Sequence, residues 1–135
     1  MKLEAIKTAQ TQLSAISNFI PRNQKQVIYS LLKGEEYQFF VNKIEQLKGL
    51  IDEMPKTYET DGKGDEAIAY LHYICGSYDF YITEKDIEKE QHQAFGLACC
   101  GYPEMGYISI IELVNSPAVE LDLFWKPKAL NQIQY

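Results

Sequence analysis

The chain has 135 residues, of which 46% are hydrophobic and 24% are charged. The length fits one domain, and the composition is typical of an ordinary soluble protein. The net charge of −6 is uneven, because residues 1–60 carry eight Lys or Arg and seven Asp or Glu, whereas residues 61–135 carry five Lys and twelve Asp or Glu. The acidic second half disfavours direct binding to nucleic-acid phosphates, which needs Lys and Arg to displace counterions. It suits a partner protein with a basic surface instead.

Three amphipathic helices are predicted in the first 55 residues, where apolar side chains recur every three or four positions. The first covers residues 3–19 and ends before Pro21, because the residue that precedes a proline avoids helical backbone angles. The second starts near Asn23, a good N-cap, and stops at Lys33 and Gly34. The third covers residues 35–54, with two Glu in its first turn. Its apolar stripe is interpreted as core: Tyr37, Phe40, Val41, Ile44, Leu47, Ile51 and Met54.

Residues 56–66 form the longest predicted loop. Gly62 and Gly64 flank Lys63 in a spacing that resembles a phosphate-binding loop. No predicted strand precedes this spacing, however, and no Ser or Thr follows a Gly-Lys pair, as that motif requires. We therefore interpret the loop as a connection between a helical part (residues 1–55) and a sheet part (residues 67–130).

A β-hairpin is predicted from residues 67–75 and 78–83, because a Gly-Ser pair separates the two strand-like runs. Alternation along the second strand places Tyr78, Phe80 and Ile82 on one face, and Asp79, Tyr81 and Thr83 on the other. We expect the first set to pack against the helices and the second set to face solvent.

Further strands and one short helix are predicted after a charged turn at residues 84–93. A strand at residues 94–100 is followed by a tight connection at 101–106 and a strand that starts at 107–108. Ser109 and Glu112 have the spacing of a capping box, which predicts a helix over residues 109–114. The last strand, residues 119–125, is expected to place Leu121, Leu123 and Trp125 on one side, before a short tail. The predicted fold class is α+β, a single domain in which three N-terminal helices pack on a small antiparallel sheet of four to five strands.

His72 is the leading candidate for catalysis, with Asp79 as its nearest candidate partner. In a hairpin with a two-residue turn, Asp79 pairs with Ile74 and lies diagonal to His72 on the same face. A general base needs a carboxylate held in this way, but a strand histidine that is merely satisfied by a neighbouring carboxylate has the same pattern, and we favour that structural interpretation. Glu84 and Asp86 are a second candidate pair.

No metal ion, cofactor or disulfide is expected. His92 lies in a charged loop, and no spaced carboxylate motif joins it to the other histidine. Cys75, Cys99 and Cys100 lack Cys-x-x-Cys spacing, so we interpret them as reduced sheet residues. The chain has no signal-peptide pattern and no apolar run long enough to span a bilayer. We therefore expect a cytoplasmic protein that does not contact a membrane.

Four motifs in the second half resemble a known family. They are Tyr-Asp-Phe-Tyr-Ile-Thr-Glu-Lys-Asp at residues 78–86, Ala-Phe-Gly-Leu at 94–97, Glu-Met-Gly-Tyr-Ile-Ser-Ile-Ile-Glu-Leu at 104–113, and Glu-Leu-Asp-Leu-Phe-Trp-Lys-Pro-Lys at 120–128. Over residues 67–130 the chain is similar to the proteins grouped as domain of unknown function 2958. The resemblance implies a gene carried by phages, plasmids or other mobile elements, often near anti-restriction and DNA-processing genes, and it implies no assigned activity.

Charge and resemblance together lead to two expected functions. The first is a non-catalytic accessory protein of a mobile element that binds a basic protein partner through an acidic, Tyr-bearing sheet face, for example an anti-restriction or anti-CRISPR inhibitor. The alternative is a small enzyme or DNA-metabolism factor that acts on nucleic acid. The predicted contact patch consists of Tyr81, Asp79, Glu84, Asp86, Asp61, Asp65 and Glu66.

Overall fold

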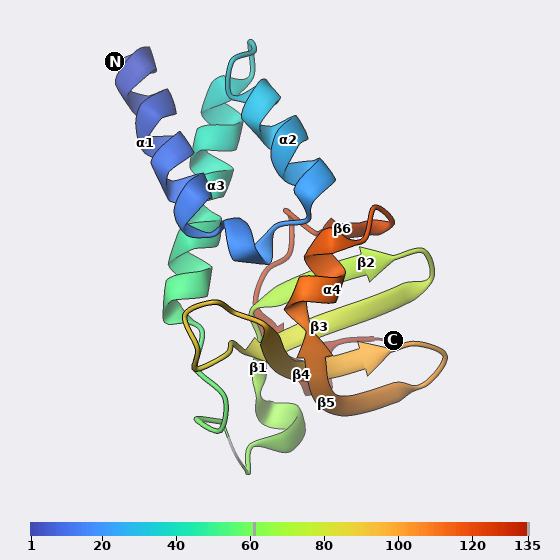
Figure 1. Ribbon diagram of the computed structural model, residues 1–135. Coiled ribbons are helices and arrows are strands. Elements are labelled where there is room, and N and C mark those ends of the chain that lie inside the picture. The colour runs from blue at the N-terminus through green and yellow to red at the C-terminus, as the bar shows by residue number, and fades with distance from the viewer. Residues whose placement is uncertain (61, 135) are drawn as a thin grey trace.

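Helices and strands are segregated along the chain in the computed structural model, which describes residues 1–60 and 62–134. The helices are α1 (Lys2–Ala15), α2 (Arg22–Leu31), α3 (Tyr37–Glu53) and α4 (Ile110–Asn115), with a short 3-10 turn, η1 (Ser17–Phe19), between the first two. Figure 1 shows α1, α2 and α3 at one end of the sheet, as the predicted α+β class requires. Within the described ranges, no helix is both long and apolar enough to cross a lipid bilayer.

The strands form a five-stranded antiparallel sheet and a separate two-stranded pair. They are β1 (Ile68–Ala69), β2 (Leu71–Cys75), β3 (Tyr78–Glu84), β4 (Gln93–Cys99), β5 (Pro103–Ser109), β6 (Val119–Leu121) and β7 (Lys128–Ala129). The order in the large sheet is β5-β4-β3-β2-β6, and β1 pairs with β7. The predicted hairpin register is confirmed, since Cys75 pairs with Tyr78. Gly76 makes this turn possible with a φ of 59°, a left-handed angle that glycine adopts without strain.

One face of the large sheet carries the main core. Apolar stripes of α1 and α3 pack there with side chains of β2 and β3, among them Leu13, Ile44, Tyr73 and Ile82. The fully buried hydroxyl of Tyr73 donates a hydrogen bond to the carbonyl of Phe19 in η1, which ties the sheet to the helical layer. The inserted helix α4 crosses in front of the sheet and contacts η1 and β4 (Figure 1). Its predicted N-cap is confirmed, because the Ser109 hydroxyl accepts a hydrogen bond from the Glu112 N–H at 3.2 Å.

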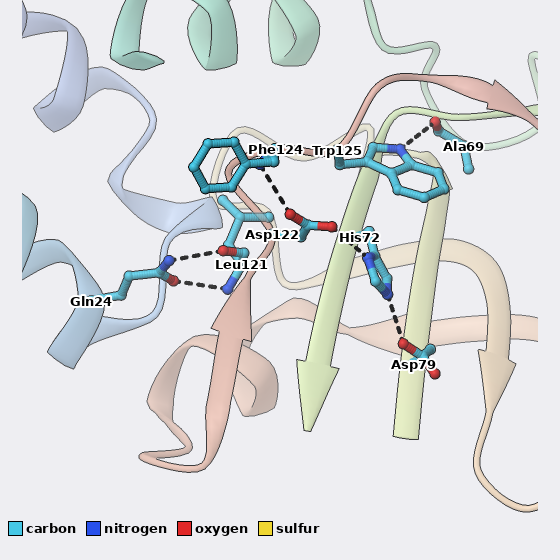
Figure 2. A network of polar contacts seen from close by, with 8 residues as sticks. All are labelled: Gln24, Ala69, His72, Asp79, Leu121, Asp122, Phe124 and Trp125. Carbon is cyan, nitrogen blue, oxygen red and sulfur yellow. Dashed lines mark hydrogen bonds and ion pairs between the residues drawn. The ribbon is translucent and has the colours of Figure 1, made fainter. Parts of the chain in front are cut away.

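Helix α2 joins the sheet through one side chain. The Gln24 amide donates to the Leu121 carbonyl and accepts from the Leu121 N–H, both at 2.8 Å (Figure 2). These two bonds replace the neighbouring strand that β6 lacks on its outer edge, so they satisfy backbone groups that an edge strand would otherwise leave open.

Several predicted boundaries are wrong, and each has a local cause. The predicted strand over residues 67–75 divides at Tyr70 into β1 and β2, which belong to different sheets. Strand β5 starts at Pro103 instead of residue 107, because the first residue of an edge strand tolerates a missing N–H. Helix α2 starts at Arg22 without a side-chain cap, and α3 starts at Tyr37, so the two preceding Glu lie before the helix.

The last strand of the large sheet ends at Leu121 instead of residue 125. The side chain of Asp122 accepts a hydrogen bond from the Phe124 N–H at 2.9 Å, a turn that Asp favours and that ends the strand's alternation. Leu121 and Leu123 therefore join the main core, whereas Trp125 lies against the opposite face of the sheet. The prediction that these three share one side is wrong for Trp125.

Residues 122–134, hereafter the C-terminal segment, cover part of the second sheet face. Leu130 and Ile133 from this segment pack on Tyr81 and Leu97 in a second, smaller core. Tyr81 is consequently only 5% exposed. The alternation predicted for β3 is right for Asp79 and Tyr81, but the prediction that this face meets solvent is wrong because the predicted tail covers it.

Candidate functional site

His72 is the centre of a polar network on the second sheet face (Figure 2). Its Nε2 atom lies 2.7 Å from Asp79 Oδ1 on β3, and its Nδ1 atom lies 3.0 Å from Asp122 Oδ2 at the turn after β6. The contact with Asp79 confirms the prediction from the hairpin register. The contact with Asp122 was not predicted, because it depends on the pairing of β6 with β2, in which Leu121 lies opposite Tyr73.

Two aromatic rings enclose His72. Tyr81 stacks on the imidazole at a centroid distance of 4.7 Å and an interplanar angle of 5°, and Trp125 lies 5.1 Å from it. The Trp125 indole donates a hydrogen bond to the Ala69 carbonyl at 3.0 Å, which fixes its ring beside the network (Figure 2). Burial, reinforced by the charges of Asp79 and other neighbours, raises the pKa of Tyr81 to about 12. Its phenol is therefore neutral at physiological pH.

The network favours a structural role for His72 over a catalytic one. A general base needs a ring nitrogen directed at a substrate proton, and carboxylates occupy both nitrogens here. The network therefore anchors the C-terminal segment to the β2–β3 hairpin. Among the described residues, no group of three metal-binding side chains converges on one point.

A cavity of about 380 Å³ opens on the half of the second face that the C-terminal segment leaves uncovered. Residues 57, 58, 60, 62 and 64 of the loop form one wall, and side chains of β3, β4 and β5 form the other. The lining residues are Thr57, Tyr58, Thr60, Gly62, Gly64, Ala67, Thr83, Glu84, Phe95 and Met105.

Backbone and hydroxyl contacts hold the loop over this cavity. The Thr57 N–H and hydroxyl both donate to the Lys85 carbonyl, at 2.9 and 3.1 Å. Tyr58 has a φ of 77°, which is unusual for a bulky residue, and its hydroxyl pairs with that of Tyr107 on β5 at 2.6 Å. This hydrogen bond, the largest contribution, raises the pKa of Tyr107. A structure that maintains a strained Tyr58 at the rim of a cavity is typical of a functional surface.

Glu84 supplies the charge inside the cavity. Regular alternation would place it with Ile82 on the helix-facing side, but a β-bulge at Thr83 lets Glu84 pair with Phe95 while Ile82 pairs with Gly96. Its side chain is only 3% exposed, and its Oε2 atom accepts hydrogen bonds from the Thr60 N–H at 2.7 Å and the Thr60 hydroxyl at 2.5 Å. The bulge therefore converts an expected strand-end surface acid into a buried carboxylate at the cavity.

The predicted contact patch is only partly retained. Tyr81 and Glu84 are buried, so the prediction that they form an exposed aromatic and acidic surface is wrong. Asp79 belongs to the His72 network. The exposed residues Asp65 and Glu66 lie in the 3-10 turn η2 (Gly64–Glu66), next to a cavity wall. Asp61 lies outside the described residues.

Asp86 has a local structural role. Its carboxylate accepts hydrogen bonds from the N–H groups of Glu88, His92 and Gln93, each at 3.1 Å. Slight burial acts to raise the pKa of Asp86, but these three backbone donors outweigh it and lower that pKa below its usual value. The candidate catalytic pair of Glu84 and Asp86 is thus divided between the cavity and a loop. No family model, curated protein or solved structure matches this chain.

Proposed function

We propose that this protein is a non-catalytic accessory protein that binds a basic protein partner through the uncovered half of the second sheet face. One observation carries the proposal. Tyr58, Met105 and Tyr107 remain 68%, 40% and 55% exposed beside a cavity that contains the Glu84 carboxylate. Tyr and Met are enriched at protein interfaces, where large side chains supply contact area. We call these three residues the Tyr58 surface.

The charge distribution supports a basic partner. Residues 61–135 carry a surplus of seven negative charges, and the exposed Asp65 and Glu66 lie at the end of the loop that lines one side of the cavity. Negative charge near an aromatic contact surface accelerates association with a positively charged partner and excludes like-charged competitors.

The resemblance to the family grouped as domain of unknown function 2958 supports a biological setting for this proposal. A phage, plasmid or other mobile element would express the protein in the host cytoplasm, where inhibition of a restriction or CRISPR system is one use of an acidic binding protein. The alternative, an enzyme acting on nucleic acid, is favoured by the contact between His72 and Asp79. It is opposed by the second carboxylate, that of Asp122, on the other ring nitrogen.

Affinity capture from a lysate of the source organism tests the proposal. Tyr107→Ser removes the ring and the hydroxyl pair from the Tyr58 surface, and we expect it to reduce capture of the partner at least tenfold. Tyr29→Ser is the matched control, because Tyr29 is similarly exposed but lies on α2. Capture should also weaken as salt is raised. Equal recovery of the same partner by both variants would exclude the Tyr58 surface as the interface.

A further inference from the structure

The cavity under the Tyr58 surface has an unusual distribution of hydrogen bonds around its carboxylate. Both donors from Thr60 reach Glu84 Oε2, and no residue within 1–60 or 62–134 donates to Oε1. In the same ranges, no side-chain oxygen or nitrogen is both fully enclosed and without a hydrogen-bond partner. Glu84 lines the cavity, and within these ranges only its Oε2 atom accepts hydrogen bonds.

We propose that this cavity binds one lysine side chain of the basic partner, with Glu84 Oε1 as the acceptor for its ammonium group. This inference rests on the proposed function and names the chemical group that the partner inserts. Among the described lining residues, Glu84 is the only carboxylate, and none of them is a Lys, Arg or His. An anion would be repelled, and a neutral apolar group would leave a desolvated carboxylate oxygen without a donor.

The walls of the cavity suit the aliphatic part of a lysine. Tyr58, Phe95 and Met105 contribute aromatic and thioether surface, which packs well against a methylene chain and attracts a nearby cation through the aromatic faces. The volume of about 380 Å³ is at the small end of the range for ligand pockets, so the space fits one side chain instead of a folded segment.

The hydrogen bonds of Glu84 also favour lysine over arginine. A guanidinium binds a carboxylate most strongly through two parallel hydrogen bonds, one to each oxygen. Thr60 already supplies two hydrogen bonds to Oε2, which leaves Oε1 for a single donor. An ammonium group binds as a compact charge and needs only that one oxygen.

Small amines test the cavity without the partner. Butylammonium mimics a lysine side chain, butylguanidinium mimics arginine, and 1-butanol supplies the same stem without charge. Titration of the ¹⁵N-labelled full-length protein should show saturable shifts of the Thr60 and Gly64 amide resonances with butylammonium at millimolar concentrations. We expect at least threefold weaker binding of butylguanidinium and no saturation with 1-butanol. Equal affinities for butylammonium and 1-butanol would overturn the proposal, since the cavity would then bind only the apolar stem.

Two variants test whether the carboxylate of Glu84 binds the ammonium group. Glu84→Gln should weaken butylammonium binding at least tenfold, whereas Glu66→Gln, the same change at an exposed position outside the lining residues, should alter it less than twofold. If Glu84→Gln does not fold, Met105→Lys gives an independent test at a partly exposed position, because its own ammonium should enter the cavity and abolish binding of the probe. Unchanged butylammonium affinity in folded Glu84→Gln or Met105→Lys would overturn the proposal.

The same variants separate this inference from the proposed function. Loss of partner capture in Tyr107→Ser, together with full capture in folded Glu84→Gln, would support the Tyr58 surface and overturn the lysine site. Loss of capture in both Tyr107→Ser and folded Glu84→Gln would support both proposals. Saturable butylammonium binding with full capture by Tyr107→Ser would refute the proposed function, while the cavity would remain a cation site.

Discussion

Gly96 on β4 is the position at which a single methyl group should disturb this fold most. It pairs with Ile82 on β3, directly beside the bulge at Thr83. A Cβ atom at Gly96 would lie 1.9 Å from the Tyr81 carbonyl oxygen and 3.0 Å from the Tyr81 carbonyl carbon. Both are backbone atoms, so no side-chain rotation can relieve the overlap, and Gly96→Ala must separate β3 from β4.

The expected cost follows from this distance. Carbon and oxygen atoms approach each other to about 3.3 Å in ordinary contacts, so the strands would have to separate by about 1.4 Å at this point. That shift breaks or stretches hydrogen bonds of the β3–β4 ladder, each worth about 1 kcal/mol. Overpacking of a filled interior adds about 1–3 kcal/mol. We expect Gly96→Ala to lower the free energy of unfolding by about 3 kcal/mol.

Gly106→Ala is a matched control, because Gly106 lies opposite Gly96 on β5 and an added Cβ there meets no atom within 4 Å. By restricting the unfolded chain, it should leave stability unchanged or raise it by about 0.4–1 kcal/mol. Urea unfolding followed by fluorescence of the single Trp, Trp125, measures both variants. The explanation is refuted if Gly96→Ala remains within 1 kcal/mol of Gly106→Ala.

Two further predictions concern the polar network. His72→Phe should keep the stack on Tyr81 but remove both ring nitrogens, so that Asp79 and Asp122 lose their contacts with the ring. We expect it to lower the free energy of unfolding by about 1–2 kcal/mol in a urea titration, and unchanged stability would show that the network does not anchor the C-terminal segment. Tyr81 has a raised pKa of about 12 in the folded protein, whereas an unfolded tyrosine has a pKa of about 10. The stability that the neutral Tyr81 phenol contributes is fully present below pH 10 and is lost as the pH rises toward 12. The free energy of unfolding of the wild type should therefore fall more between these pH values than that of Tyr81→Phe. Equal losses in the two proteins would contradict a raised pKa for Tyr81.

The sequence by itself determined the features that depend on neighbouring residues. The apolar stripe of α3 follows from three- and four-residue spacing, and the Ser109 cap from a four-residue motif. The β2–β3 register follows from a two-residue turn, and it correctly brought His72 next to Asp79. Each of these is a local relation, so the side chains that form it are visible in a short stretch of sequence.

Only the tertiary structure decided which faces are covered and where Glu84 points. Alternation along β3 shows which residues share a face, but it is the same whether solvent or another segment covers that face, and Tyr and Thr suit both environments. The C-terminal segment buries Tyr81 and brings Asp122 to His72 across 50 residues of sequence. The bulge at Thr83, which turns Glu84 into the cavity, depends on pairing with β4, and no local pattern specifies that pairing. Long-range packing therefore determines both the buried network and the proposed lysine site.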